Sequence, residues 1–147
     1  MAEGELVPDA HHVVRYCKNT QVTNGVASGA AFQLEGTHQE LSVNWLEHLH
    51  PAPDRVAQLR AARAAMEQTL RLKDNGWFAV LAGGCITSLT ELSGTALALL
   101  VRHHPEDGND GHSAVHGLPE IGSSLATAVG LELASRVTEA AIQLRNM

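Results

Sequence analysis

A chain of 147 residues with 44% hydrophobic side chains is long enough to bury a core, which excludes a wholly disordered protein. A net charge of −6 argues against extensive nucleic-acid binding, because phosphate recognition requires clustered Lys and Arg. No apolar run approaches the roughly 18 residues that a membrane span requires, and the acidic N-terminus lacks the apolar segment of a signal peptide. We therefore expect a cytoplasmic protein without a membrane partner, with residues 1–10 as a flexible arm and residues 11–147 as a single α+β domain.

The N-terminal third of the chain predicts three strands. Residues 12–17 are rich in β-branched and aromatic side chains, and Arg15 lies on a face that we expect to be partly buried. Residues 30–34 predict a second strand. Residues 41–47 alternate apolar and polar side chains as a half-buried strand does, until Leu46 breaks the alternation and predicts a bend or a helical turn.

The middle of the chain predicts a helix followed by strands. Asp54 is a suitable N-cap for an amphipathic helix, which we expect to end at Asn75 and Gly76. Residues 77–82 predict a strand that ends at a Gly-Gly break. Residues 96–102 form an apolar run without a polar member until its last residue, which favours a central strand buried on both faces.

The C-terminal segment predicts a second amphipathic helix. Ser123 or Ser124 can cap it, and apolar residues recur at helical spacing through to Leu144. The order of elements therefore predicts an α+β fold with a mixed β-sheet of about five to six strands and two amphipathic helices. The two cysteines, Cys17 and Cys85, occur in apolar or strand-like segments and are expected to be buried free thiols.

Residues 103–117 concentrate titratable side chains and are the first place to look for chemistry. They hold four of the nine histidines and three acidic residues, between an apolar run and an amphipathic run. Histidine titrates near neutral pH and is the most common ligand of transition metals. The stretch does not match a calcium-binding EF-hand loop or the zinc-protease motif H-E-x-x-H.

A divalent metal is one open interpretation of this stretch. His112 and His116 would share a face and could bind one ion together with Asp107 if their segment were helical. If the segment were extended, the two rings would lie about 13 Å apart, which is too far for one ion. The interpretation without any chemistry is a polar turn whose histidines satisfy backbone groups or bind a partner.

Acid–base catalysis without a metal is the other chemical interpretation. One histidine held by a carboxylate can act as a general base. No complete catalytic motif lies within the loop itself, so its partners must come from elsewhere in the chain. The candidate catalytic residues are His104, His112, Arg15 and Glu47.

Three short patterns carry a resemblance to a known group of proteins. They are residues 31–34 (Ala-Phe-Gln-Leu), residues 41–47 (Leu-Ser-Val-Asn-Trp-Leu-Glu), and the segments 104–107 and 112–115, each of which begins with a histidine. Together these resemble a family of small uncharacterised bacterial proteins with an LSVxWLE segment and a C-terminal pair of histidine motifs. Ser113 interrupts the usual His-Ala step of that pattern. The family has no established activity, so the resemblance implies no catalytic residues.

Two functions are suggested by these observations. The acidity of the chain and its lack of a complete catalytic motif favour a small protein-interaction domain, whose partner is another protein such as a co-encoded effector. The alternative is a histidine-dependent hydrolase, either metal-assisted or using a general base, that acts on a phosphoester or a nucleotide.

Overall fold

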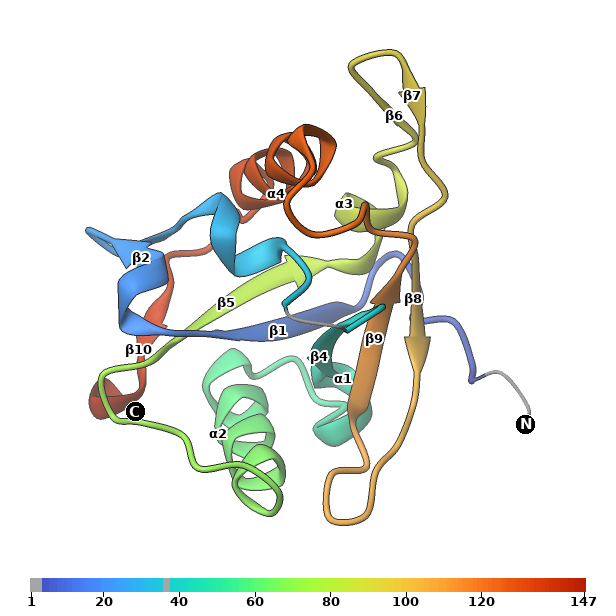
Figure 1. The fold of residues 1–147 in the computed structure, drawn as a ribbon. Helices are drawn as coiled ribbons and strands as arrows, with labels where there is room; N and C mark the ends of the chain where they lie inside the picture. The colour runs from blue at the N-terminus through green and yellow to red at the C-terminus, as the bar shows by residue number, and fades with distance from the viewer. Residues whose placement is uncertain (1–3, 36–37) are drawn as a thin grey trace.

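The computed structural model describes residues 4–35 and 38–147 and has an α+β fold built on one large sheet (Figure 1). The sheet has six strands in the order β10-β5-β1-β4-β9-β8. Their bounds are β1 (His12–Cys17), β4 (Leu41–Trp45), β5 (Trp77–Ala82), β8 (Leu100–His103), β9 (His112–His116) and β10 (Ile142–Gln143). The predicted α+β class and number of strands are confirmed, although the sheet is antiparallel in every described pairing and not mixed.

Helices cover both faces of this sheet. The two long helices are α2 (Arg55–Glu67) and α4 (Ser124–Ser135). Two short helices, α1 (Leu46–Leu49) and α3 (Gly83–Thr87), lie beside them. The described chain also contains three 3-10 turns: η1 (Asn19–Gln21), η2 (Gly29–Phe32) and η3 (Leu144–Asn146). Two small hairpins complete the fold: β2 (Val22–Thr23) pairs with β3 (Val26–Ala27), and β6 (Glu91–Leu92) pairs with β7 (Thr95–Ala96). Within the described ranges, no helix is long and apolar enough to cross a membrane.

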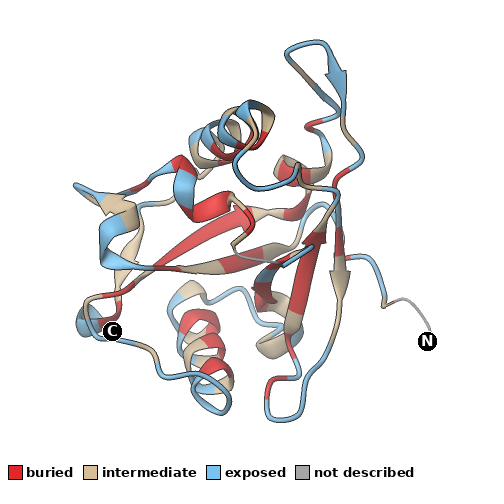
Figure 2. Cartoon of the chain, viewed as in Figure 1, coloured by how far each residue is buried: buried red, intermediate tan, exposed pale blue. Residues whose placement is uncertain are grey.

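The two faces of the sheet carry separate apolar cores. Alternate residues of β1 divide between them: Val13 packs with the core under η2, α3 and α4, and Val14 packs with the core under α1, α2 and η3. Phe78, which is 1% exposed, belongs to the second core. Figure 2 shows the buried residues along β5 and β9 and on one side of α2, where Leu59, Ala62 and Met66 meet the sheet.

The sheet separates between β1 and β4. Every residue of β1 pairs with β5, but only Val13 and Val14 pair with Trp45 and Asn44 of β4. The remainder of β1 and the beginning of β4, which contains Ser42, therefore lie next to each other without a shared ladder. This separation leaves room for a cavity within the sheet layer.

Local sequence signals place the starts of the long helices correctly. The Asp54 side chain accepts from the backbone N–H of Ala57, and the Ser123 hydroxyl accepts from that of Ala126, as expected of N-caps. The helical turn predicted at Leu46 is confirmed as α1.

Both long helices end earlier than predicted. The Thr69 hydroxyl donates to the Met66 carbonyl and the Ser135 hydroxyl donates to the Glu132 carbonyl, so each side chain occupies a backbone acceptor near the helix end. Apart from the exposed Ala140, the apolar residues beyond α4 are nevertheless partly or fully buried, because residues 142–143 pair with β5 and Leu144 fills the second core. The apolar residues after α4 that recur at helical spacing are therefore buried by the strand β10 and the turn η3, and not by a longer helix.

The predicted strand over residues 30–34 is wrong, since residues 30–32 belong to the 3-10 turn η2 and residues 33–34 belong to no strand. A Cβ on Gly29 would lie 2.9 Å from the Leu131 backbone nitrogen, and one on Gly130 would lie 2.5 Å from the Gly29 carbonyl oxygen. The two glycines therefore permit η2 to pack directly on the backbone of α4, and this contact with a distant helix favours the turn over a strand.

The outer edge of the sheet also differs from prediction. The apolar run 96–102 contributes β8, which ends the sheet order and is not central, and Leu100 is 36% exposed. Residues 4–7, part of the segment predicted as a flexible arm, lie along this edge: the Val7 N–H donates to the Val101 carbonyl, and the His103 N–H donates to the Glu5 carbonyl. Residues 4–7 thus cover β8, whereas residues 1–3 lie outside the described part of the chain.

The cysteines give a first testable prediction. Both are free thiols, and burial raises the pKa of Cys17 to about 11, against a smaller lowering by the positive charge of Arg15. The Cys17 thiol therefore stays protonated at pH 8, and only thiolates react readily with disulfide reagents. We expect DTNB to modify Cys85 alone in the folded protein and both cysteines in urea; equal reaction of the two in the folded state would contradict this.

Candidate functional site

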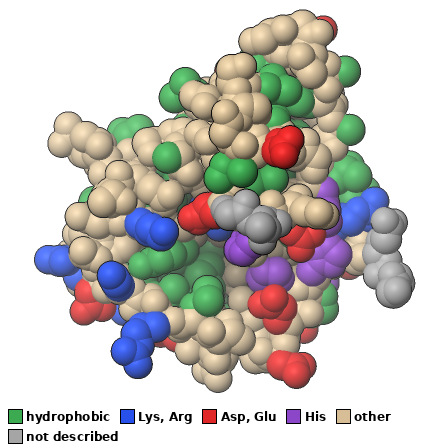
Figure 3. All heavy atoms as spheres, viewed as in Figure 1, with side chains coloured by type: hydrophobic (Ala, Val, Ile, Leu, Met, Phe, Trp, Pro, Cys, Tyr) green, Lys and Arg blue, Asp and Glu red, His purple; other side chains and the backbone are tan. Residues whose placement is uncertain are grey.

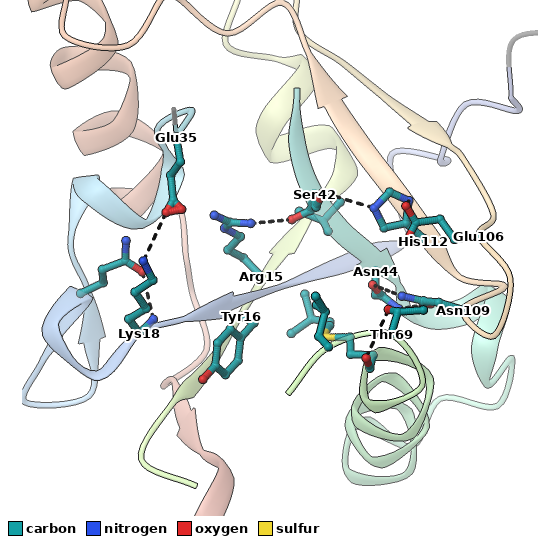
Figure 4. Close-up of a pocket in the computed structure, with 15 residues that line it drawn as sticks. Arg15, Tyr16, Lys18, Glu35, Ser42, Asn44, Thr69, Glu106, Asn109 and His112 are labelled. Carbon is teal, nitrogen blue, oxygen red and sulfur yellow. Dashed lines mark hydrogen bonds and ion pairs between the residues drawn. The ribbon is translucent and has the colours of Figure 1, made fainter. Parts of the chain in front are cut away.

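A cavity of about 300 Å³ occupies the separation between β1 and β4 (Figure 4). It is bounded by both strands, by the end of α2 and by the turn between β8 and β9. Its apolar wall contains Met66 and Leu70, and its polar wall contains Arg15, Ser42 and His112. Figure 3 shows the apolar side chains of this region between lysines and arginines on one side and the histidines on the other. Its volume is at the lower end for small-molecule sites.

His112 and Ser42 form a hydrogen-bonded pair in this cavity. The His112 Nδ1 atom lies 2.8 Å from the His104 carbonyl oxygen, which can only accept, so Nδ1 is the nitrogen that carries the proton when the ring is neutral. The Nε2 atom is then an acceptor, 3.2 Å from the Ser42 hydroxyl oxygen. A nucleophile beside a base that is itself oriented by a third group is the arrangement used in covalent catalysis.

The turn between β8 and β9 holds this histidine in place. The backbones of Glu106 and Asn109 exchange two hydrogen bonds of 3.0 and 2.9 Å, and the Glu106 carboxylate lies 3.9 Å from the His112 Nδ1 atom. The Asn109 side chain forms a reciprocal amide pair with Asn44 of β4, at 2.7 and 3.3 Å. The turn is therefore fixed against the same strand that carries Ser42.

Arg15 crosses the gap between the two strands. Its Nε atom donates to the Ala31 carbonyl at 3.0 Å, and its Nη1 atom donates to the Ser42 carbonyl at 2.9 Å. Burial lowers the pKa of the guanidinium, an effect partly opposed by Cys17 and Glu35. An arginine remains charged at neutral pH even so, and this places a fixed positive charge beside Ser42.

The structure brings some of the predicted catalytic residues together. Arg15 and His112 line the same cavity. His104 contributes its backbone carbonyl to His112, but its ring points toward His116, with 2.9 Å between the two Nε2 atoms. Glu47 lies away from the cavity, on α1.

Glu47 instead joins α1 to the start of β1. One carboxylate oxygen accepts from the His12 backbone N–H at 2.6 Å, and the other forms a hydrogen bond of 2.6 Å with the His12 Nδ1 atom. Burial acts to raise the pKa of Glu47, but the hydrogen bonds from the His12 ring and backbone outweigh it and the pKa is lowered overall.

This lowered pKa predicts how Glu47 contributes to stability across pH. A carboxylate with a folded-state pKa below the unfolded value of about 4.3 stabilises the fold above that pH, and loses its contribution as the pH falls through the folded pKa. We expect the Glu47→Gln variant to have a lower free energy of unfolding than the wild type at pH 7. The two free energies of unfolding should approach each other below about pH 4. Urea unfolding across pH tests this, with the exposed Glu120→Gln as control; a constant difference at every pH would contradict it.

The predicted metal ligands are not brought together. His112 and His116 are the ends of strand β9, so the extended alternative applies and their backbones are about 13 Å apart. Asp107 lies in the exposed turn. Among the described residues, two other groups place three donor atoms within 4.8 Å of one another: Glu40 with His104 and His116, and His48 with His103 and Asp110.

Ser42, Asn44 and Asn109 were not among the candidate site residues predicted from the sequence. Ser42 and Asn44 occupy the polar positions of an alternating strand, a pattern that equally describes any solvent-facing side chains. Asn109 is 2% exposed within a turn whose composition is typical of surface loops. Only the pairing of β4 with β9, which sets Asn44 opposite His112, reveals that these residues meet.

Comparisons with protein-family models, with curated proteins and with solved structures found no match to this chain. The resemblance to small bacterial proteins therefore stays a prediction. Any function has to be argued from the cavity and its side chains.

Proposed function

We propose that this protein is a histidine-dependent hydrolase that acts on a small phosphoester, such as a single nucleotide, in the cavity between β1 and β4. The observation that supports this most is the Ser42–His112 pair, whose histidine is oriented by the His104 carbonyl. Among the side chains of the cavity, this pair has the donor and acceptor arrangement of an activated nucleophile.

The proposed reaction uses this pair in two steps. The Ser42 hydroxyl oxygen attacks phosphorus while the His112 Nε2 atom takes its proton. The new P–O bond forms, the bond to the leaving oxygen breaks, and His112 returns the proton to that oxygen. Water then attacks the phosphoserine by the reverse sequence of proton transfers and releases phosphate and free Ser42. General-base assistance of this kind contributes about 10²- to 10⁴-fold to a rate.

The charges and shape of the cavity favour a small anionic substrate. Among the described hydrogen bonds, Arg15 uses two of its five N–H donors, and others can bind a phosphoryl group beside Ser42. Lys18 adds a second cation at the rim, where its ammonium lies 3.6 Å from Glu35. Met66 and Leu70 provide an apolar surface for an organic group such as a base. A volume of about 300 Å³ favours a substrate no larger than a mononucleotide.

A reactive probe tests the nucleophile without knowledge of the natural substrate. We expect a fluorophosphonate to label the folded protein at Ser42, as located by mass spectrometry. The His112→Ala variant should not be labelled. The Ser28→Ala variant removes another exposed serine and should label as the wild type does. Labelling that is absent, or independent of His112, would overturn the proposal.

The interaction domain favoured by the sequence stays a prediction. The exposed large apolar side chains come from separate elements, among them Val26, Val56, Ile121 and Leu131. A stable partner that co-purifies with a protein inert to fluorophosphonates and phosphoesters would favour this function over the hydrolase.

A further inference from the structure

We propose that Glu40, His104 and His116 form a binding site for one divalent transition-metal ion of the Zn²⁺ type. This site goes beyond the proposed hydrolase function and does not depend on it. One donor atom from each residue lies within 4.8 Å of the other two, and all three residues are half-buried. Two imidazoles and one carboxylate are a ligand set that suits Zn²⁺ and neighbouring first-row metals.

The edge of the sheet creates this grouping. His104 directly follows β8 and donates its backbone N–H to the His112 carbonyl, so it lies opposite the start of β9. His116 ends β9, and Glu40 precedes Leu41, the partner of Val115. Ala114 lies between His112 and His116 on the same face of β9, and its methyl group leaves room for the rings of His104 and His116 to meet above it.

The distance between the rings agrees with shared coordination. The two Nε2 atoms are 2.9 Å apart. Two nitrogens bound to one ion at about 2.0–2.1 Å are about 2.9 Å apart at a right angle and about 3.3–3.4 Å apart at a tetrahedral angle. A small adjustment of either ring thus converts the contact into a pair of metal bonds.

The carboxylate supplies the negative charge that such a site requires. A Glu40 oxygen lies 3.4 Å from the His116 Nδ1 atom, and the Glu40 side chain is 43% exposed and can turn toward an ion. The ligands come from the beginning of β4, the end of β8 and the end of β9, so an ion would join three neighbouring strands. It would also hold His104, whose carbonyl orients His112.

The second group of donors is already satisfied by its own contacts. The His103 Nε2 atom lies 2.6 Å from the Asp110 carbonyl oxygen, and the His48 Nε2 atom lies 2.7 Å from the Asp110 carboxylate. The His48 and His103 rings also contact the Trp45 ring, at centroid distances of 5.1 and 5.4 Å respectively. These hydrogen bonds and ring contacts account for the cluster, so we place the ion at Glu40, His104 and His116.

Metal binding can be measured directly on the untagged full chain. After treatment with EDTA and buffer exchange, we expect calorimetric titration with Zn²⁺ to show one tight site per chain, and Co²⁺ to develop visible absorption bands. His104→Ala and His116→Ala should each weaken Zn²⁺ binding by at least about 10-fold, since loss of even an outer-shell partner costs about 10- to 100-fold. Glu40→Gln should weaken it as well while keeping the size of the side chain.

The controls separate this site from the rest of the histidines. His48→Ala removes the competing group and His50→Ala removes a histidine outside both groups, so both should bind Zn²⁺ as the wild type does. Circular dichroism of the metal-free variants checks that each is folded. Binding that survives both His116→Ala and Glu40→Gln, or that is lost with His48→Ala, would overturn the proposal. Because no substrate is involved, this outcome is independent of Ser42 labelling.

Discussion

The His112→Ala variant is expected to lose about 10²- to 10⁴-fold in its rate of phosphoester hydrolysis. Without the imidazole, the Ser42 hydroxyl has no acceptor for its proton when it attacks phosphorus. Arg15 and the apolar wall remain in place, so substrate binding should change less than turnover. The kcat and KM for p-nitrophenyl phosphate, followed by release of p-nitrophenolate, separate these two effects.

Matched variants show whether His112 and Ser42 act as a unit. Ser42→Ala alone and the double variant should be about as slow as His112→Ala, because groups that share one step are not additive. The His50→Ala control removes a histidine outside the cavity and should keep wild-type turnover. Losses that multiply in the double variant would mean that the two residues act independently, contrary to the proposed mechanism.

Elements with a strong local signal were predictable from the sequence. The strand at residues 12–17, the caps Asp54 and Ser123, and the turn at Leu46 depend on neighbouring residues, and the structure contains all of them. The 3-10 turn at Gly29 was not predictable, because it is set by contact with Gly130, about a hundred residues away in the chain.

The site shows the same division between local and distant information. The concentration of histidines drew attention to residues 103–117, and His112 indeed lines the cavity. Glu47 follows Trp45 by only two residues, yet the change from strand to helix at Leu46 directs it to His12. The partner of His112 is Ser42, which the pairing of β4 with β9 brings close. Sequence spacing contains no information on that pairing.

Replacing Asn109 with Ala is expected to lower the free energy of unfolding by about 1–3 kcal/mol, the cost of leaving a buried polar group without its partner. Asn44 and Asn109 are 3% and 2% exposed, and each side-chain amide donates to the oxygen of the other. Truncation of either therefore leaves the remaining amide buried and unsatisfied. Urea unfolding followed by tryptophan fluorescence measures the loss.

A double-mutant cycle distinguishes this pair from two independent polar residues. The variant with Ala at both positions should lose less stability than the sum of the single variants, because it leaves neither amide unpaired. The pair also anchors the turn whose Asn109 carbonyl accepts from the His112 backbone N–H at 3.3 Å. Asn109→Ala should therefore slow fluorophosphonate labelling of Ser42, though less than His112→Ala does. Additive losses of stability together with unchanged labelling would show that the turn is positioned by its backbone alone.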